Sequence, residues 1–334
     1  MWKHLVSVAL LAAGLAWGGA AWAADSAVVV LYHRFGDDRS PASNTRLDQL
    51  DAHLAELASG GYTVLPLPEI IAAFKAGRAL PDKTVAITID DGSASVYSRA
   101  WPRLKKAGLP FTVFVATDEA DRGGEAMTWT QLRELAAAGV TIGTLGAQRG
   151  HMAKAGREAV AADLARARVR FLKELNQPAE LLAWSYGETS DEAMAAASEA
   201  GFIAAFGQQS GVAHAKADAF FLPRFAMNET YGEIDRFRVA VRALPIPAVD
   251  VTPGDPLLRT NPPAFGFTLA EEVGGIDALA CFAAHEGKVR VERLGPRIEV
   301  RMARPIPPGR GRLNCTVPTL EGRWRWFGWQ FVVP

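Results

Sequence analysis

The first two thirds of the sequence alternate between strand-like and helix-like segments, and this alternation limits the fold more than any other feature. Short apolar runs rich in β-branched residues are typical of buried strands, and segments with helical spacing of apolar residues separate them. Glycines follow several expected helix ends, where a left-handed residue closes a helix: Gly60, Gly108, Gly139 and Gly201. Because strands joined by helical crossovers pair in parallel, the pattern predicts an α/β fold.

The expected strands are residues 27–32, 62–65, 84–89, 111–115, 140–142, 181–184 and 202–206. The expected helices are residues 47–57, 67–75, 97–107, 130–138, 158–175 and 191–200. An open doubly wound sheet fits this order too. We favour a distorted (β/α)7-type barrel, because polar residues cluster directly after the strands, as the carboxyl-terminal face of a barrel requires.

The sequence changes character near residue 243. Prolines crowd the next stretch, and short alternating runs separated by Pro and Gly turns follow it. Such runs predict a small antiparallel β-sandwich. We therefore expect a barrel over residues 24–243, a Pro-rich linker over residues 244–264 and an all-β sandwich over residues 265–334.

The first 23 residues resemble an export signal. A short basic start precedes an apolar run, and Ala21-Trp22-Ala23 is a small-x-small cleavage site. The run is too short, and too rich in Ala and Gly, for a membrane span. We expect cleavage after Ala23 and a periplasmic or secreted protein without a stable membrane span; an uncleaved N-terminal anchor is the alternative.

The net charge and the cysteines limit which partners the chain can bind and indicate in which compartment it is found. The 36 basic and 36 acidic residues cancel, so nothing attracts the chain to nucleic acid, and no nucleic-acid partner is expected. Cys281 and Cys315 are the two cysteines of the chain. In an oxidising compartment they predict a disulfide, although two buried free thiols fit the sequence equally well.

An acidic pair ends one of the expected strands. Residues 85–89 run directly into Asp90-Asp91-Gly92, which places two carboxylates at the mouth of the core. Neighbouring residues leave a strand end in different directions, so one carboxylate can hold a metal while the other takes a proton. Other polar residues follow other strands and predict a shared site: His33, Gln148, Arg149, His151, Ser185, Tyr186, Glu188, Gln208, Gln209 and Arg224.

Residues 27–240 resemble the polysaccharide deacetylases of the NodB-homology group, carbohydrate esterase family four. Residues 88–92, Thr-Ile-Asp-Asp-Gly, are similar to the family's first motif, Thr-Phe-Asp-Asp-Gly. Residues 182–187 are similar to its third motif in an exopolysaccharide-deacetylating branch. The resemblance implies that Asp90 is the general base, that Asp91 binds a divalent metal, usually zinc, and that the backbone amide of Tyr186 serves an oxyanion hole.

The second motif of that family, His-x-x-x-His, is degenerate here. Its alignment places Leu145 and Arg149 where two histidines complete the metal site. Leucine cannot ligate a metal, and the cationic arginine repels one. His33 and His151 are the remaining candidate ligands beside Asp91, although their spacing does not match the family. The alternatives are a surface-loop role for His151 and, for His33, a hydrogen bond to Asp90 or Asp91.

The resemblance implies an exported hydrolase that removes N-acetyl groups from an N-acetylated polysaccharide or oligosaccharide. Arg149 would stabilise the oxyanion or pair with Asp91, and the expected substrate-binding residues are Trp184, Gln208 and Arg224. The alternative is a catalytically silent carbohydrate-binding protein that has lost the metal-binding histidines. Residues 323–329, Arg-Trp-Arg-Trp-Phe-Gly-Trp, offer aromatic faces for sugar stacking or a sandwich core with an Arg-rich outer face.

Overall fold

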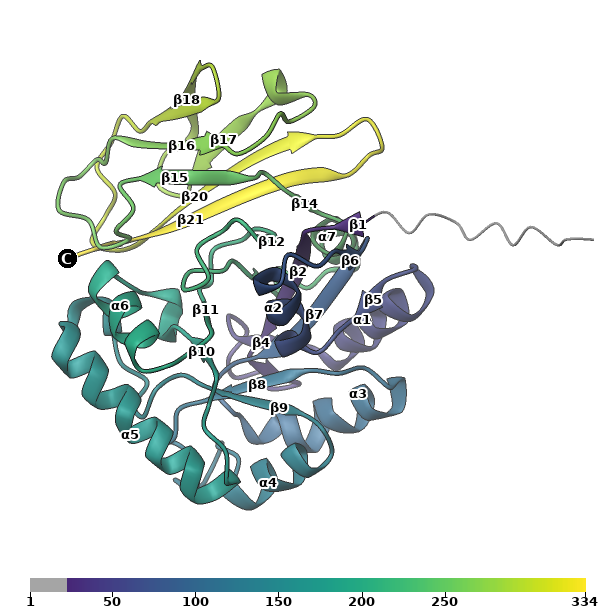
Figure 1. The fold of residues 1–334 in the computed structure, drawn as a ribbon. Coiled ribbons are helices and arrows are strands. Elements are labelled where there is room, and N and C mark those ends of the chain that lie inside the picture. The colour runs from purple at the N-terminus through teal and green to yellow at the C-terminus, as the bar shows by residue number, and fades with distance from the viewer. Residues whose placement is uncertain (1–22) are drawn as a thin grey trace, which may run out of the picture.

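The computed structural model describes residues 23–334. The predicted export signal therefore lies outside the described residues, apart from Ala23 at its end. Within residues 23–334, no helix is both long and apolar enough to cross a membrane. Two large sheets form the centres of two domains, and Figure 1 shows one domain above the other: the curled-sheet domain, up to residue 243, and the second domain, from residue 244.

The sheet of the curled-sheet domain is almost entirely parallel. Its strands follow the order β11-β10-β9-β8-β7-β2-β12, and β13 and β5 pair with β2 and β7. All pairs are parallel except β12 with β2. The bounds are β2 Ser26–Tyr32, β5 Thr63–Val64, β7 Thr84–Ile89, β8 Thr112–Val115, β9 Thr141–Thr144, β10 Leu181–Ala183, β11 Ala204–Phe206, β12 Ala213–His214 and β13 Phe225–Ala226.

Helices cover the outside of this sheet (Figure 1). They are α1 Leu47–Ser59, α2 Leu67–Lys75, α3 Trp101–Ala107, α4 Trp129–Ala137, α5 Arg157–Leu175, α6 Asp191–Glu199 and α7 Ile234–Val241. Side-chain caps explain some of the helix starts: Thr128 and Ser190 accept backbone N–H bonds at the starts of α4 and α6. The helix expected from residue 97 instead begins with a π-helical turn, Val96–Ala100. Short paired strands complete the domain: β1 Ala23–Ala24 with β6 Leu80–Pro81, and β3 Arg34–Phe35 with β4 Asn44–Thr45.

The parallel sheet curls back on itself through the segment between β12 and α7. Leu222 forms a single parallel bridge to Phe206 in β11, and three residues later β13 pairs with β2. This segment thus links the last strand of the sheet to the first. The carboxyl ends of β2, β7, β9 and β11 consequently face one common mouth, as the sequence predicts for the polar residues that follow them.

The second domain is an antiparallel sheet folded over its own core. Its strands follow the order β14-β21-β20-β17-β18-β19-β16-β15. They are β14 Leu244–Pro245, β15 Ala248–Thr252, β16 Phe265–Leu269, β17 Ala280–Ala283, β18 Gly287–Leu294, β19 Arg297–Arg301, β20 Gly309–Pro318 and β21 Trp324–Val333. Although β16 and β21 are far apart in this order, Phe265 contacts Phe331 and Phe267 contacts Phe327, so two layers pack face to face. The residues expected as a linker contribute β14 and β15 to this sheet.

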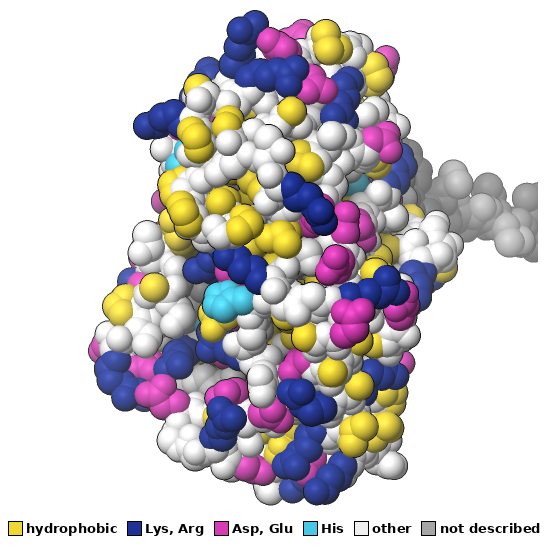
Figure 2. Space-filling model, turned by 90° about the vertical axis from the view of Figure 1, so that its left-hand side faces the viewer, with side chains coloured by type: hydrophobic (Ala, Val, Ile, Leu, Met, Phe, Trp, Pro, Cys, Tyr) yellow, Lys and Arg dark blue, Asp and Glu magenta, His cyan; other side chains and the backbone are white. Residues whose placement is uncertain are grey.

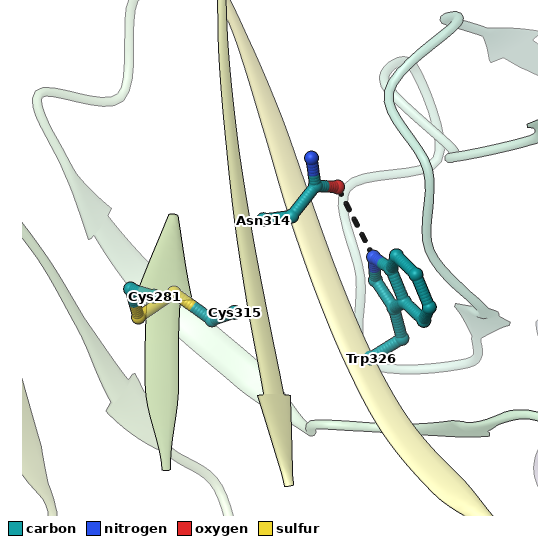
Figure 3. The surroundings of a disulfide bond; sticks show 4 residues. All are labelled: Cys281, Asn314, Cys315 and Trp326. Carbon is teal, nitrogen blue, oxygen red and sulfur yellow. Dashed lines mark hydrogen bonds between the residues drawn. A yellow bond between two sulfur atoms is a disulfide. The ribbon is translucent and has the colours of Figure 1, made fainter. Parts of the chain in front are cut away.

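A disulfide crosses the inner face of the second domain. Cys281 in β17 stands directly opposite Cys315 in β20, and their sulfur atoms are bonded (Figure 3). The predicted disulfide is therefore confirmed, and the alternative of two free thiols is wrong. Asn314, the residue before Cys315 in β20, points the opposite way and accepts a hydrogen bond from Trp326 Nε1 at 3.1 Å. One face of β20 thus carries the disulfide, and the opposite face carries the hydrogen bond between Asn314 and Trp326.

The β20–β21 hairpin packs on the curled-sheet domain through a tryptophan on each face of β21. Trp326, on the outer face, contacts Phe225 with ring centroids 5.2 Å apart. Trp329, on the inner face with Leu313, contacts Phe221 at 5.1 Å and also Phe265 of the second domain. Gly328 lies so close that a Cβ there would stand 1.9 Å from the Ser210 carbonyl oxygen. Trp326 and Trp329 therefore contact both domains, so they do not belong to a core confined to the sandwich.

Candidate functional site

A pocket of about 250 Å³ opens at the mouth of the curled sheet. Its wall combines residues that follow β2, β7, β9, the short turn after β10, and β11 with residues of β20. The predicted site residues that it brings together are His33, Asp90, Asp91, Arg149, Ser185, Tyr186 and Gln208. Figure 2 shows Lys, Arg and His side chains gathered where the upper and lower parts of the molecule meet.

Asp90 is buried at the base of this pocket and is held by Arg224. Its two carboxylate oxygens accept separate hydrogen bonds from Arg224 Nη1 and Nη2, each at 2.7 Å. Neither side chain is more than 1% exposed. Arg224 also donates from Nε to the Gly207 carbonyl oxygen at 2.9 Å. This bidentate pair fixes the orientation of the carboxylate, and each of its oxygens keeps a further lone pair that can accept a proton.

Asp91 turns in another direction and meets Arg149. Its backbone is left-handed, with φ of 73°, a conformation that aspartate tolerates better than most residues. Arg149 Nη2 lies 3.1 Å from Asp91 Oδ2. Burial raises the pKa of the Asp91 carboxyl, while the nearby His33 and Arg149 act in the opposite direction. Asp91 therefore has a cationic partner of its own in the place that the family resemblance assigns to a metal.

The donor set at this mouth does not fit a catalytic zinc ion. Such a site needs three protein ligands around an open position. Leu145 and Arg149 line the pocket at the two aligned histidine positions, and neither can ligate a cation. Among residues 23–334 no group of three His, Cys, Asp or Glu side chains is placed to hold a metal. The proposed ligand set of Asp91, His33 and His151 is thus not assembled.

His151 does not line the pocket. Its side chain is 61% exposed, and its Nδ1 is 2.6 Å from Glu188 Oε2. The imidazole stacks on the Tyr186 ring with centroids 4.6 Å apart. The assignment of His151 as a metal ligand is therefore wrong for this structure, and its alternative as a loop residue fits better. The sequence showed the residue type but not the Glu188 carboxylate that engages it.

Tyr186 lines the pocket and contacts residues of both domains. It occupies a left-handed conformation, with φ of 61°, in the short turn Ser185–Gly187. Its carbonyl oxygen accepts hydrogen bonds from Gln330 Nε2 at 3.0 Å and from Arg310 Nη1 at 3.3 Å, both from the second domain. Arg149 approaches the ring, with Cζ 5.3 Å from its centroid. A left-handed tyrosine costs roughly 1–3 kcal/mol, and this ring of partners holds it in place.

Two residues expected to bind substrate are buried instead. Trp184 and Arg224 have no solvent-exposed surface. Trp184 Nε1 donates to the Phe220 carbonyl oxygen at 2.8 Å, and Arg224 is committed to Asp90. Both assignments to substrate contact are wrong, because each side chain supports the pocket from within the core. Gln208 does line the pocket.

Arg310 and Arg312 line the same pocket from β20, and sequence reasoning missed them. Alternation along β20 signals them: Gly311, Leu313 and Cys315 are buried while the residues between them are not. That pattern identifies an outward face with two arginines. It does not say that the face covers the mouth of another domain more than a hundred residues earlier in the chain.

Comparison with known proteins gives the class to which this fold and mouth belong. Residues 77–205 match the family described as polysaccharide deacetylase. Residues 77–205 are therefore similar to a polysaccharide deacetylase domain, and the resemblance found in the first and third motifs, which lie within these residues, is confirmed.

Individual relatives support the same class. The poly-beta-1,6-N-acetyl-D-glucosamine N-deacetylase of Escherichia coli (strain K12) is 28% identical over 131 residues, which cover 34% of this chain and 20% of that protein. The chain thus matches only about a fifth of that relative's length. The structure of IcaB from Ammonifex degensii aligns with a TM-score of 0.58 at 24% identity, over 66% of this chain and 98% of that one. The Streptococcus pyogenes deacetylase PplD aligns with a TM-score of 0.60 at 20% identity, over 65% and 98%.

Proposed function

We propose that this chain binds an N-acetylated polysaccharide at the pocket of the curled-sheet domain without metal-dependent hydrolysis. The Arg149–Asp91 ion pair carries this proposal, because it puts a guanidinium at the position of a metal ligand. Leu145 closes the other ligand position with an apolar side chain. Among residues 23–334 the side chains around the pocket do not supply the three ligands with which a catalytic metal ion lowers the pKa of a hydrolytic water.

The second candidate function is N-deacetylation, the hydrolysis of the C–N bond of an N-acetyl group. Two observations favour it: Asp90 and Asp91 both line the pocket, and the left-handed turn at Tyr186 is present. In this candidate Asp90 accepts the proton of the attacking water and the Tyr186 amide stabilises the oxyanion. Arg149 would have to supply positive charge to that oxyanion, which requires it to leave Asp91.

We infer an exported protein, periplasmic or secreted, from the first 23 residues together with the disulfide of the second domain. Disulfides persist in oxidising compartments and are rare in the cytosol. Both a surface polysaccharide and an oligosaccharide derived from one would be accessible there. Mass spectrometry of the mature protein from cell fractions tests this inference, with an N-terminus at Ala24 as the expected result.

Metal content and acetate release separate the two candidate functions. The purified mature protein is assayed for zinc by elemental analysis, for acetate release from N-acetylated chito-oligosaccharide, and for binding of that oligosaccharide by calorimetry. We expect binding, no stoichiometric zinc and no acetate. Tight zinc with metal-dependent acetate release would overturn the proposal in favour of the deacetylase.

A double substitution restores the family's ligands and sharpens this test. Leu145→His with Arg149→His gives Asp91 two imidazole neighbours and removes the competing guanidinium. We expect zinc affinity to rise and acetate release to appear. The matched control is Leu320→His with Arg290→His, which makes the same replacements at exposed positions of the second domain. Equal zinc uptake by both variants would show that the pocket has no special suitability for the metal.

A further inference from the structure

Three arginines line the candidate pocket, and two of them come from the second domain. Arg310 and Arg312 stand two residues apart on β20, so both side chains leave the same face of the strand, and both line the pocket. Arg149 reaches it from the loop after β9. We propose that these guanidinium groups bind an anionic substituent, a carboxylate or a phosphate, of the saccharide that enters the pocket.

The carboxylates that line the pocket do not neutralise this cluster. Asp90 is fully engaged by the buried Arg224, which is itself not part of the pocket wall. Asp91 pairs with Arg149. Asp90 and Asp91 are thus paired with Arg224 and Arg149. Arg310 keeps only the distant Glu188 carboxylate, and Arg312 has no carboxylate partner among the described residues.

Arg310 has only a distant carboxylate partner. Its Nε lies 3.7 Å from Glu188 Oε1, and Glu188 also bonds His151 through its other oxygen. The remaining contacts of Arg310 are with Tyr186, whose carbonyl oxygen accepts from Nη1. The guanidinium is thus oriented at the pocket rim by a tyrosine and is shared with a carboxylate that has a second partner.

Arg312 is the stronger indication of a ligand. It is partly buried, and among the described residues it has no carboxylate within ion-pair distance; its Nε reaches Gln330 Oε1 at 3.4 Å. Burial and the neighbouring Arg310 lower the pKa of the Arg312 guanidinium, against a small opposite effect of Tyr231, in keeping with the lack of a carboxylate partner. A bound oxyanion would supply the missing charge and accept two parallel N–H bonds.

This inference rests on the proposed binding of a saccharide and specifies its chemistry. A planar guanidinium pair suits carboxylate and phosphate oxygens equally. A polysaccharide in which N-acetylated sugars alternate with acidic ones would present both the N-acetyl group of the proposed function and an anion for the arginines of β20. The neutral N-acetylated polymer would meet the same walls but leave the arginines of β20 unpaired.

Calorimetry with acidic and neutral oligosaccharides of equal length tests the inference. The probes are a hyaluronan hexasaccharide, which alternates glucuronate with N-acetylglucosamine, and chitohexaose, which is neutral. We expect the acidic probe to bind at least about tenfold more tightly at low salt, and raising the salt to remove most of that advantage. Arg312→Gln should weaken the acidic probe about tenfold and leave the neutral one unchanged. Arg290→Gln, at an exposed site of β18, is the matched control and should change neither.

The outcomes separate this inference from the function on which it rests. Equal binding of both probes, or an Arg312→Gln variant that binds the acidic probe as the parent does, would overturn the inference and leave saccharide binding intact. Binding of neither probe would overturn both. Competition identifies the anion: displacement by glucuronate supports a carboxylate, displacement by N-acetylglucosamine 1-phosphate supports a phosphate, and displacement by neither contradicts the proposal. A urea unfolding curve for each variant confirms that it is folded.

Discussion

The curled-sheet domain and the second domain are stabilised in different ways. The first buries a large apolar core, and inside it a complete ion pair between Asp90 and Arg224. The second has a smaller core and a covalent link, the disulfide between Cys281 and Cys315. A parallel sheet covered by helices can isolate charges from water, whereas a thin sandwich has little interior in which to do so.

This difference explains where the chemistry of the pocket comes from. The buried acid belongs to the domain with the deep core, and the partly exposed arginines belong to the outer face of the thin one. Each domain thus contributes the kind of charged group that its own packing can support. Four experiments can break or sharpen this contrast.

Removal of the buried arginine should have the largest effect. Arg224→Met leaves Asp90 in the core without its partner, so we expect a loss of about 3–5 kcal/mol in the free energy of unfolding. Urea unfolding followed by circular dichroism measures it. The control is Arg149→Met, which breaks the more exposed pair with Asp91 and should cost at most about 1 kcal/mol. Equal losses in the two variants would show that burial does not determine how much each ion pair contributes to the free energy of unfolding.

Removal of the disulfide should come next and should act on the second domain. Cys281→Ala with Cys315→Ala releases a crosslink between residues 34 positions apart, which predicts a loss of about 2–4 kcal/mol. Hydrogen exchange measured by mass spectrometry should show faster exchange in β17, β18 and β20 than in β7 and β8. Uniform acceleration across both domains would mean that they unfold as one unit.

Mild acid should weaken the curled-sheet domain specifically. His53 is fully buried, accepts from the Tyr32 hydroxyl at Nδ1 and donates from Nε2 to the Gly232 carbonyl oxygen. Burial lowers its pKa from 6.5 to about 4. The unfolded chain therefore takes up a proton first as the pH falls, and stability declines between pH 6.5 and 4, by about 2 kcal/mol at pH 5.

The substitution His53→Gln checks the source of that decline, because glutamine does not titrate. We expect the variant to be less stable at pH 7 and to lose less on acidification, as measured by urea unfolding at both pH values. His214, whose pKa burial also lowers to about 4, should retain its own contribution. A variant with the full acid sensitivity of the parent would assign the effect to other groups.

The smallest effect should come from a charge pair that spans the two domains at the surface. Lys216 Nζ lies 3.0 Å from Glu271 Oε2, and both side chains are about half exposed. Lys216→Gln should change the free energy of unfolding by less than about 0.5 kcal/mol. A loss above 1 kcal/mol would indicate that charge, rather than the packing of Trp326 and Trp329, holds the domains together.

Local sequence patterns predicted the elements well where a single period decides the structure. The strand at residues 84–89 and the helix at residues 67–75 have the predicted bounds, because their apolar spacing and flanking residues leave no competing alternative. The acidic pair was also found correctly at a strand end. These are short-range properties, set by the neighbours of each residue.

The parts that could not be predicted depend on contacts between distant residues. Trp184 and Arg224 looked like polar or aromatic residues at a mouth, but only the fold shows that they point into the core. Arg310 bonds the carbonyl of Tyr186, 124 residues earlier, which no periodicity signals. The role of residues 244–264 was missed for the same reason, since their prolines obscured two strands that pair elsewhere in the sheet.

Gly328 packs directly against the Ser210 carbonyl, and there is no room for a Cβ atom between the two domains at this point. Any larger side chain at this point would wedge the hairpin away from the curled sheet. Since the same hairpin carries Arg310 and Arg312, a wedge would draw both guanidinium groups back from the mouth. A substitution at Gly328, outside the pocket, can therefore change the width of the pocket and the ligands that it binds, although glycine has no side chain that could contact them.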